Sequence, residues 1–456
     1  MKISYSFLFF LLFSGSYISL SQTISGKVLD ANSKKPIENV NIYLSDKTSI
    51  GTNSGSEGFF SFQIPKKVAK KDSIRFSVLG YKTFTIALNE LLQKANIILL
   101  EKQTTELKEV NVSTKRKQNF IRFKKIGELE NNTYSFASLL IDDKIYISGG
   151  DTSTEEDSFK RATIRANEKS PNPTFLDVIN NWEPSFTKQA YSNHFLTFDL
   201  KTYETSIVSK KIYARAYHNM NYYDGELYIL GGKYLSGIKK NEYLSNKIEV
   251  VDIEKNTIQI DKTNPHQAIN FASFVYKDNI VAMGGSLKIK KDGRKEYSDK
   301  IHQYNIKTGY WFEIGKMKTP KETSGILFND KFYVFGGFKD EALHTIESWN
   351  VTTGVWKQEG ELFREAEKPA VTKDDTTIFI YHHGLLMQFN PIKKSLKSYR
   401  INLYLKDAKL HFYNDSLYII GGYRETEFSK EPSSAIYKID ISEFNRTKVN
   451  KSKIFN

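Results

Sequence analysis

The chain has 456 residues, of which 39% are hydrophobic and 14% aromatic, enough apolar material for more than one packed core. It contains no cysteine, which excludes disulfide-stapled scaffolds and attachment through a lipidated N-terminal cysteine. The formal charge is +14, but the basic residues are spread along the chain, so we interpret them as a lysine-rich surface and expect no nucleic-acid partner.

Residues 1–21 have the pattern of a secretory signal peptide. An early Lys2 is followed by the apolar run Phe7–Phe13 and by small residues before Gln22. This run is too short to cross a bilayer, and no later stretch approaches about 18 apolar residues, so we expect no transmembrane segment in the mature chain. Export without cysteine fits a bacterial envelope better than an animal secretory route. We expect the protein to be periplasmic, outer-membrane-associated or extracellular in a Gram-negative bacterium.

Residues 22–101 alternate apolar and polar side chains between turn signals, which is typical of short antiparallel strands. Val40, Ile42 and Leu44 form one apolar face, and a Gly/Ser turn separates them from a second face that begins at Phe60. About seven strands in this length predict a small β-sandwich.

Several motifs in this segment resemble the carboxypeptidase-regulatory-like (transthyretin-like) domain. They are Gly26–Val28, Pro36–Val40, Gly51-Thr52 with Gly58–Phe60, and Leu79–Lys82. The resemblance implies a non-catalytic domain of the kind found at the N-terminus of outer-membrane receptors and exported enzymes.

Residues 102–118 are polar and are predicted to be a linker. Within them, Leu107–Val112 resembles the segment that follows this domain in TonB-dependent receptors. The remaining chain is not patterned as a receptor barrel, so the receptor's transport role is not carried over. An accessory part in an outer-membrane uptake complex stays open as an alternative.

A ten-residue phrase ending in two glycines recurs through residues 119–450, first as IDDKIYISGG at Ile141–Gly150. A sixth copy, Asp375–His383, ends in His382-His383 instead. Paired glycines permit positive φ and close backbone approach, so we expect them to be structural. The five pairs are Gly149, Gly150, Gly231, Gly232, Gly284, Gly285, Gly336, Gly337, Gly421 and Gly422.

A second phrase places Asp or Asn at positions 199, 252, 305, 350, 390 and 440, which gives six units of 40 to 53 residues. Repeats of this length indicate a propeller or solenoid. A third phrase begins at Trp311 and at Trp356, and FKKIGEL (Phe123–Leu129) matches it ahead of the first unit. The N-terminal segment is therefore predicted to supply the outer strand of the sixth blade and close the ring.

The glycine pair, the Asp/Asn and the tryptophan six positions later resemble the kelch repeat. The predicted fold is all-β: a small β-sandwich followed by a six-bladed kelch β-propeller closed by an N-terminal outer strand, with residues 451–456 as a tail.

In a kelch propeller, the resemblance implies that partners meet one face of the ring. That face is built by the loops leading into the inner strands and by the loops after the glycine pairs. The first set supplies Tyr134, Arg215, Tyr217, His218, Asn219, His266, Asn270, Lys321, Glu322, Arg364, Glu365, Lys368, Lys409 and His411. The second supplies Asp151, Lys233, Tyr234, Lys339, Asp340, Tyr423 and Arg424.

Arginines and tyrosines converging on one mouth suit anionic sugars or acidic peptides. The alternative is a solvated polar face. The selected binding candidates are Arg215, Tyr217, His218, Asn219, Tyr234, Glu322, Lys339, Arg364, Glu365 and Arg424.

Two other features have both functional and plain interpretations. The pair His382-His383 resembles half of a metal site, but no acidic or histidine partner lies nearby in sequence, so we expect divergence of one blade, no metal and no cofactor. The long loop 151–192 contains acidic Glu155–Asp157 and apolar Phe175–Trp182, a predicted helix; it is interpreted as a binding element or as a disordered insertion.

Enzymatic signatures are few. Copper radical oxidases with kelch domains need a cysteine, and this chain has none, so that activity is excluded. No zinc-protease, nucleophile-elbow or phosphate-loop motif occurs in the sequence. Kelch-type sialic-acid mutarotases stay open, with Arg215, Glu322, Arg364 and Glu365 as candidates by analogy. We expect non-catalytic binding of a protein or glycan at the cell envelope, with a sugar-processing enzyme of the mutarotase kind as the alternative; the oligomeric state stays open.

Overall fold

The computed structural model describes residues 22–45, 47–64, 72–91, 96–102, 117–185, 188–208, 211–237, 241–289 and 294–455. The chain forms two compact units, Met1–Thr114 and Lys115–Asn456, which are treated separately below. The expected signal peptide and most of the predicted linker lie outside the described residues. No helix in the described part of the chain is both long and apolar enough to span a bilayer.

The first unit is the predicted β-sandwich, with seven strands in two sheets ordered β4-β1-β7 and β3-β2-β5-β6. Phe60, Phe62 and Ile64 alternate with exposed residues and face the core, where they meet Ile42 and Phe76. The elements are β1 (Gln22–Asp30), β2 (Asn41–Leu44), β3 (Lys47–Asn53), β4 (Phe59–Ile64), β5 (Ser73–Ser77), β6 (Phe84–Ala87), α1 (Leu88–Leu91) and β7 (Asn96–Leu100).

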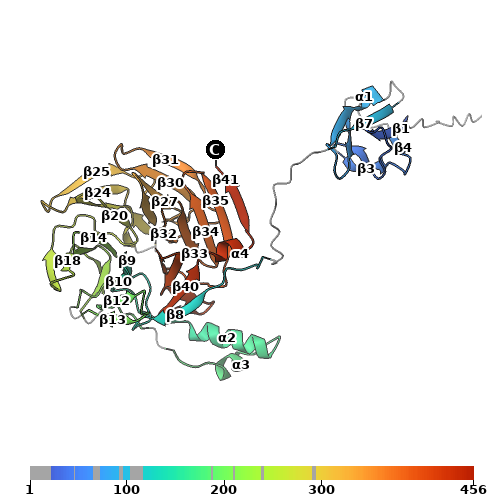
Figure 1. Ribbon diagram of the computed structural model, residues 1–456. Helices are drawn as coiled ribbons and strands as arrows, with labels where there is room; N and C mark the ends of the chain where they lie inside the picture. The colour runs from blue at the N-terminus through green and yellow to red at the C-terminus, as the bar shows by residue number, and fades with distance from the viewer. Residues whose placement is uncertain are drawn as a thin grey trace, which may run out of the picture. The chain divides into compact units, whose positions relative to one another are not determined.

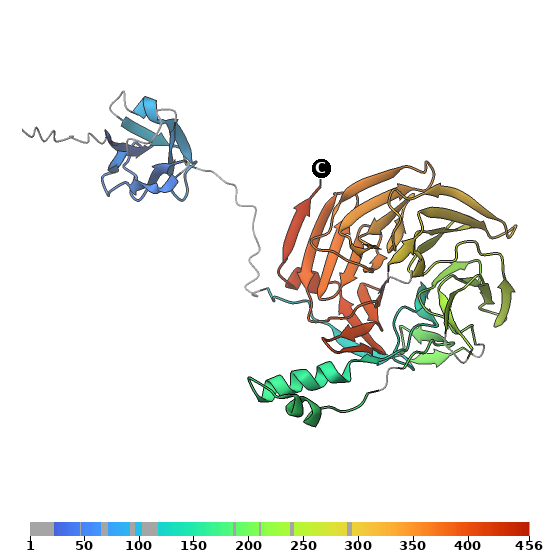
Figure 2. The same ribbon diagram turned by 180° about the vertical axis from the view of Figure 1, so that it is seen from behind.

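The second unit consists of six antiparallel sheets that follow one another around an axis, as a six-bladed propeller (Figures 1 and 2). Blade one consists of β9 (Ala137–Ile141), β10 (Lys144–Ser148), β12 (Phe195–Asp199) and β13 (Thr205–Ile207). Blade two consists of β14 (Asn219–Tyr223), β15 (Glu226–Leu230), β18 (Ile248–Asp252) and β19 (Thr257–Asp261). Blade three consists of β20 (Ala272–Tyr276), β21 (Asn279–Met283), β24 (Lys300–Asn305) and β25 (Trp311–Lys316). Blade four consists of β26 (Gly325–Phe328), β27 (Lys331–Phe335), β30 (Thr345–Asn350) and β31 (Trp356–Glu361). Blade five contains β32 (Ala370–Lys373), β33 (Ile378–His382), β34 (Leu385–Asn390) and β35 (Ser395–Arg400). Blade six consists of β36 (Lys409–Tyr413), β37 (Ser416–Ile420), β40 (Ala435–Asp440) and β8 (Lys124–Glu128).

The ring closes as predicted, because β8 from the N-terminal side pairs with β40 from the C-terminal side. Glu128 lies opposite Ala435 in this antiparallel pair. Closure removes the open edge that the sixth blade would otherwise present.

The predicted tail is instead part of a blade. Residues Lys451–Ile454 form β41, which pairs with β35 as a fifth strand of the fifth blade, and Phe455 packs beside Phe389. Sequence alternation could not reveal this strand, because KSKI is short, polar and stabilised by the open edge that it covers.

The second strand of each blade explains the apolar part of the repeated phrase. In β27 and β37, four and five successive residues are buried, because neighbouring blades cover both faces of the sheet. Between blades four and five, for example, Phe335 and Ile346 share a core with Ile380, Met387 and Phe389.

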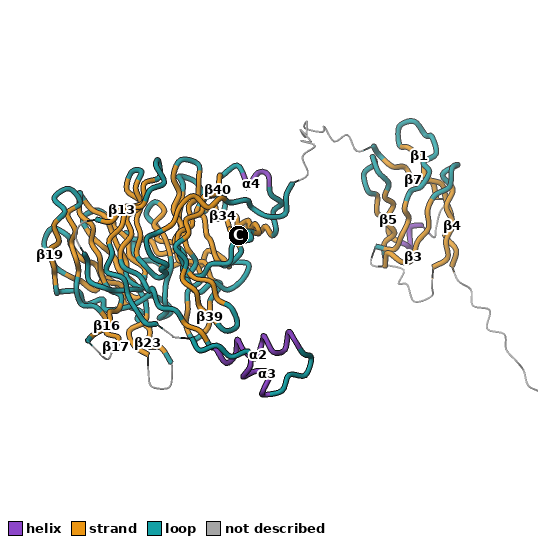
Figure 3. The backbone as a smooth tube through the Cα atoms, turned by 90° about the horizontal axis from the view of Figure 1, so that it is seen from below, coloured by secondary structure: helices purple, strands orange, loops and turns teal. Residues whose placement is uncertain are grey.

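Additional elements extend from one face of the propeller, at the bottom of Figure 3. The insertion of the first blade contains helix α3 within the stretch predicted to be helical, and helix α2, whose N-terminus is capped by Asp157. These elements are β11 (Glu155–Glu156), α2 (Ser158–Lys169), α3 (Phe175–Asn180), β16 (Lys233–Ser236), β17 (Asn241–Leu244), β22 (Ser286–Ile289), β23 (Lys295–Tyr297), β28 (Phe338–Lys339), β29 (Glu341–Ala342), β38 (Tyr423–Glu425) and β39 (Ser429–Pro432). A short helix, α4 (Glu443–Arg446), follows β40.

The paired glycines join each blade to the next. The second glycine N–H donates to a carbonyl in the loop leading into the following blade, as in Gly150 to Arg215 O (2.8 Å) and Gly337 to Ala366 O (2.9 Å). The others are Gly232 to Ala268 O, Gly285 to Lys321 O and Gly422 to Thr133 O, the last of which joins blade six to blade one.

The altered fifth copy preserves this contact one residue later. His383 and Gly384 both have positive φ, +35° and +80°, and form the two-residue turn between β33 and β34. The Gly384 N–H then donates to Leu403 O at 2.9 Å, which completes a ring of six inter-blade hydrogen bonds. The histidine pair therefore marks a blade with a tight turn in place of the longer loop after the glycines.

Two glycines of the fourth blade differ in how closely other atoms approach them, although both have positive φ. Gly337 has φ +108°, and a Cβ there would lie 2.3 Å from Glu322 O, whereas Gly354 has φ +71° and open space around it. We expect Gly354→Ala to cost about 1 kcal/mol of stability and Gly337→Ala about 2–4 kcal/mol, measured by denaturant unfolding. Equal losses at both sites would show that backbone conformation alone requires the glycines.

Candidate binding site

One residue from each blade forms a ring around the propeller axis, two positions before the inner strand begins. This mouth ring consists of Ser135, Tyr217, Asn270, Thr323, Lys368 and Asp407. On one side it is linked through the backbone: Tyr217 N–H donates to Ser135 O (2.7 Å), Asn270 N–H to Tyr217 O (3.3 Å) and Thr323 N–H to Asn270 O (2.9 Å).

On the other side an ion pair completes the mouth ring. Lys368 pairs with Asp407, and the Ser135 hydroxyl donates to Asp407 Oδ2 at 2.6 Å. Burial alone would lower the pKa of Lys368 and raise that of Asp407, but their attraction outweighs it. The pKa of Lys368 is therefore raised and that of Asp407 lowered, and both remain charged.

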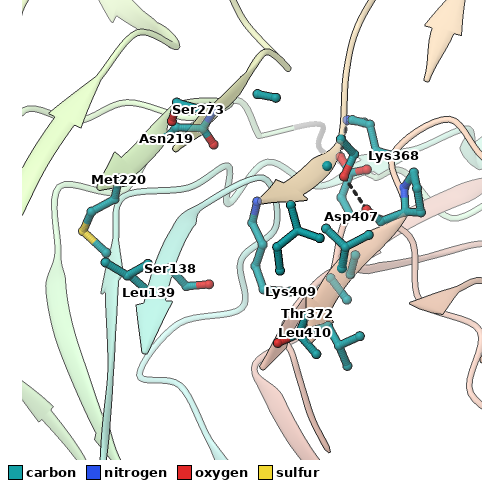
Figure 4. Close-up of a pocket in the computed structure, with 18 of the residues that line it drawn as sticks. Ser138, Leu139, Asn219, Met220, Ser273, Lys368, Thr372, Asp407, Lys409 and Leu410 are labelled. Carbon is teal, nitrogen blue, oxygen red and sulfur yellow. Dashed lines mark hydrogen bonds and ion pairs between the residues drawn. The ribbon is translucent and has the colours of Figure 1, made fainter. Parts of the chain in front are cut away.

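A cavity of about 520 Å³ is bounded by the mouth ring and the six inner strands (Figure 4). Space is available because four of these strands start with a very small residue. The six first residues are Ala137, Asn219, Ala272, Gly325, Ala370 and Lys409. The walls combine hydroxyl and amide groups with apolar groups; examples are Ser138, Ser273 and Thr372 beside Met220 and Leu410.

Lys409 is the exceptional member of this layer, because it places an amine where four other blades have alanine or glycine. Figure 4 shows a dashed line between Lys368 and Asp407 but none at Lys409. Among the residues that the structure describes, none accepts a hydrogen bond from Lys409 Nζ or forms an ion pair with it. Burial lowers the pKa of Lys409 to about 8, against the opposing attraction of Asp407.

Two histidines of the cavity lining are uncharged at neutral pH. His411 Nε2 lies 2.8 Å from the Ser138 hydroxyl, and burial together with Lys409 lowers the pKa of His411 to about 3. His218 is 2% exposed, contacts Ser148 Oγ at 2.8 Å, and has a pKa far below its usual value because of burial. Both act as neutral hydrogen-bonding groups.

Tyrosines and lysines gather on the face above the mouth ring. We define this tyrosine–lysine rim as Tyr134, Tyr191, Tyr217, Tyr423, Lys233 and Lys430. Lys430 Nζ lies 4.3 Å from the ring centre of Tyr134 and 4.5 Å from that of Tyr423, and Lys233 Nζ lies 4.6 Å from that of Tyr217. Burial, with nearby carboxylates, raises the pKa of all four tyrosines, so their hydroxyls stay protonated.

Three of the ten selected candidates, Tyr217, His218 and Asn219, line the cavity together. Tyr217 donates its hydroxyl to Asp151 at 2.8 Å, and the Asn219 amide donates to Phe271 O at 2.6 Å. These three residues come from the loop and strand that open blade two.

Arg215, Glu322 and Arg364 have structural partners. Arg215 is 1% exposed and pairs with buried Glu249. Glu322 is fully buried and accepts hydrogen bonds from three side chains, those of Ser286, Lys295 and Asn270. Arg364 donates to the carbonyls of His382 and His383.

The remaining four candidates lie outside the cavity lining. Tyr234 stacks on Tyr243 with ring centres 5.9 Å apart, and Lys339, Glu365 and Arg424 are exposed. The loop residues that the sequence places on this face include Lys368 and Lys409, although neither is among the ten binding candidates, and they do not include Ser135 or Asp407. Their common signal is position, at or two residues before the start of an inner strand.

His382 and His383 do not gather further ligating groups: within the described ranges, no cluster of three His, Cys, Asp or Glu residues could hold a metal ion. Burial and the neighbouring Arg364 lower the pKa of His382 to about 4.

Comparison with known proteins identifies both units. Residues 24–112 match the family model of the CarboxypepD_reg-like domain, and residues 323–362 match that of the Kelch motif. The protein carries a carboxypeptidase-regulatory-like domain and a kelch propeller. Both resemblances noted in the sequence are thereby confirmed. The kelch match covers β26, β27, β30 and β31, a blade in which the glycine pair, the asparagine and the tryptophan all occur, as they also do in blade three.

Among solved structures, one titled "Structure of YjhT" is similar to this chain with 12% sequence identity and a TM-score of 0.48. The match covers 69% of this chain and 99% of that one. None of the curated proteins matches.

The buried Arg215–Glu249 pair generates a stability prediction. Arg215→Ala leaves Glu249 buried without its partner and should lower the free energy of unfolding by about 3–5 kcal/mol. The exposed Arg424→Ala should change it by less than about 0.5 kcal/mol. Thermal and denaturant unfolding measure both; a small effect of Arg215→Ala would contradict the structural role.

Lys409 generates a pH-dependent prediction. Below about pH 8 both folded and unfolded chains hold its proton, and the folded chain bears the cost of burying it. Between about pH 8 and 10.5 only the unfolded chain holds it, so stability due to this group rises with pH. Lys409→Met should therefore stabilise the protein by about 1–3 kcal/mol at neutral pH, with a smaller difference above pH 10.

The matched control is Lys373→Met, which removes an exposed lysine of the same lining and should have little effect at any pH. Destabilisation of the Lys409→Met protein at neutral pH, measured by unfolding at several pH values, would show that Lys409 has a stabilising partner.

Proposed function

We propose that this protein binds a small acidic sugar at the cell envelope, with the sugar ring in the axial cavity of its kelch propeller. The observation that carries the proposal is the cavity lined by hydroxyl and amide groups, which opens beside a rim of tyrosines and lysines. The first domain is assigned no catalytic part.

The cavity suits a carbohydrate in size and in chemistry. Its volume of about 520 Å³ is within the range that small-molecule sites occupy. Ser138, Ser273, Thr372 and Asn219 offer hydrogen-bonding groups, and Met220 and Leu410 offer apolar contact for the C–H face of a sugar ring.

An acidic group on the sugar is favoured by two lysines that have no carboxylate partner among the described residues. Lys233 pairs with Glu242 at 2.7 Å and Lys368 with Asp407, so the charges of these two lysines are already balanced. Within the described part of the chain, neither Lys430 at the rim nor Lys409 in the cavity has such a partner. A carboxylate on the ligand would supply the missing charge.

The envelope location rests on the signal-peptide pattern of residues 1–21, the absence of cysteine and the type of the first domain. An accessory part in outer-membrane uptake has no support beyond that domain.

A sugar-processing enzyme is the second candidate, favoured by two groups near the mouth whose pKa values move toward neutrality. Burial lowers the pKa of Lys409 to about 8 and raises that of Glu367, the residue before Lys368. Groups with pKa values shifted in this way are typical of acid and base pairs.

Calorimetric titration of the full chain with paired acidic and neutral sugars tests the proposal. The pairs are glucuronate with glucose, galacturonate with galactose, and N-acetylneuraminate with N-acetylmannosamine. At least one acidic sugar should bind about tenfold or more tightly than its neutral counterpart, which corresponds to about 1.4 kcal/mol.

Lys430→Ala should weaken that binding about tenfold by removing the rim cation. The matched control is Lys438→Ala, a lysine of the same blade that lies over Tyr203 and Tyr418 and does not line the cavity. Absence of saturable binding by every acidic sugar would overturn the proposal and direct attention to a protein partner.

A further inference from the structure

Lys409 lies below the mouth ring in a position that its counterparts leave empty. It is the first residue of β36, two residues beyond Asp407, which corresponds to about 7 Å along an extended strand. Four of the other five inner strands begin with alanine or glycine. Because these residues are small, the Lys409 amine faces open cavity and not packed side chains.

Asp407, the carboxylate expected to pair with Lys409, already has other partners. Asp407 pairs with Lys368 and accepts a hydrogen bond from the Ser135 hydroxyl at 2.6 Å, and no described residue accepts a hydrogen bond from Lys409 or forms an ion pair with it. Lys409 therefore combines desolvation with a neighbouring ammonium group, that of Lys368. These are the two circumstances that make a lysine amine nucleophilic.

We propose that Lys409 is a nucleophile that captures the carbonyl group of an open-chain acidic sugar as a Schiff base inside the cavity. The proposal rests on the sugar site proposed above and assigns it a covalent step. It also specifies the substrate class, a reducing sugar whose carboxylate and carbonyl lie at opposite ends, such as a uronic acid.

The positions of Lys430 and Lys409 are the reason to expect the carboxylate and the carbonyl at opposite ends of the sugar. Lys430 lies over Tyr134, which directly precedes Ser135 of the mouth ring, and over Tyr423, which directly follows the glycine pair of blade six. Lys409, in contrast, lies beyond the mouth ring. A carboxylate held at the rim by Lys430 would direct the other end of the sugar toward Lys409.

The step balances without an oxidant or reductant. The lone pair of neutral Nζ attacks the carbonyl carbon, the C=O π electrons move to oxygen, and a proton passes from nitrogen to that oxygen. The resulting carbinolamine loses its hydroxyl with one more proton as water, and a C=N bond forms. The sum is amine plus carbonyl giving imine plus water, and the lining offers the Ser138 hydroxyl, in contact with His411 Nε2, as a proton-exchanging group.

Other ionisable groups in the lining are Tyr217, His218, Lys368, Lys373, Asp407 and His411. Burial raises the pKa of Tyr217 and lowers those of His218 and His411, while the ion pair keeps Lys368 and Asp407 charged. The rate of capture should therefore follow the deprotonation of Lys409, with a midpoint near pH 8.

Reductive trapping of the full chain tests the proposal. Protein is incubated with glucuronate or galacturonate and cyanoborohydride, and the adduct is counted by intact mass and located by peptide mapping. We expect one adduct per chain, on Lys409, formed at least about tenfold faster than on other lysines because more of its amine is neutral. Lys409→Arg and Lys409→Met should both abolish this adduct, and Lys438→Arg should not change it.

A sugar locked as a ring separates this inference from the proposed function. Methyl β-D-glucuronoside has the carboxylate but cannot open, so it should protect Lys409 from glucuronate and form no adduct itself. Binding of both sugars with no enrichment of adduct at Lys409 would overturn the nucleophile and leave the sugar site in place. Adduct at Lys409 with glucose as readily as with glucuronate, and without protection by the glycoside, would overturn the acidic-sugar site and leave the nucleophile.

Discussion

Six backbone hydrogen bonds hold the propeller together at its mouth, one from each blade to the next. Each begins at a residue with positive φ, from Gly150 in the first blade to Gly384 in the fifth, and ends on a carbonyl of the following loop. A side chain at Gly150 or Gly337 would lie less than 2.5 Å from the loop that leads into its own blade, at Thr133 Oγ1 or Glu322 O, so these positions require glycine. Because the same loops lead into the inner strands, these bonds also fix where the six strands start around the axis, and the pairing of β8 with β40 makes the ring continuous.

The same arrangement explains why several charged loop residues are structural. Arg215, His266, Lys321 and Arg364 occupy similar places ahead of their inner strands, and each donates to the carbonyl of the first residue of the glycine or histidine pair in its own blade. They satisfy acceptors that the turn would otherwise leave buried and unpaired. The chemistry of the mouth is therefore left to the next positions along the chain, the mouth ring and the first residues of the inner strands. There, small residues leave a cavity, and Lys409 supplies an amine that has no partner among the described residues.

The sequence predicted the architecture well because architecture repeats. Glycine pairs, Asp/Asn positions and the displaced copy of the outer strand at Phe123–Leu129 each recur, and their spacing gives blade number and closure. The site could be predicted only in part, because it depends on what differs between copies. Charge and aromaticity in the loops pointed to Tyr217 and Asn219 but equally to Arg215 and Glu322, since sequence does not show that Glu249 and Lys295 neutralise the latter two. Lys409 becomes notable only when four of its five counterparts are seen to be alanine or glycine, and β41 only when the edge of β35 is seen to be open.

The proposed chemistry of the cavity depends most on the protonation state of the Lys409 amine, which can be measured directly. Lysine labelled with ¹³C at the ε carbon, followed by NMR across pH, reports the titration of each lysine, and Lys409→Arg assigns the resonance in question. We predict a midpoint near pH 8 for Lys409 in the free protein. A midpoint at the ordinary value of about 10.4 would contradict the account, because it would show that the cavity already provides Lys409 with water or with a partner.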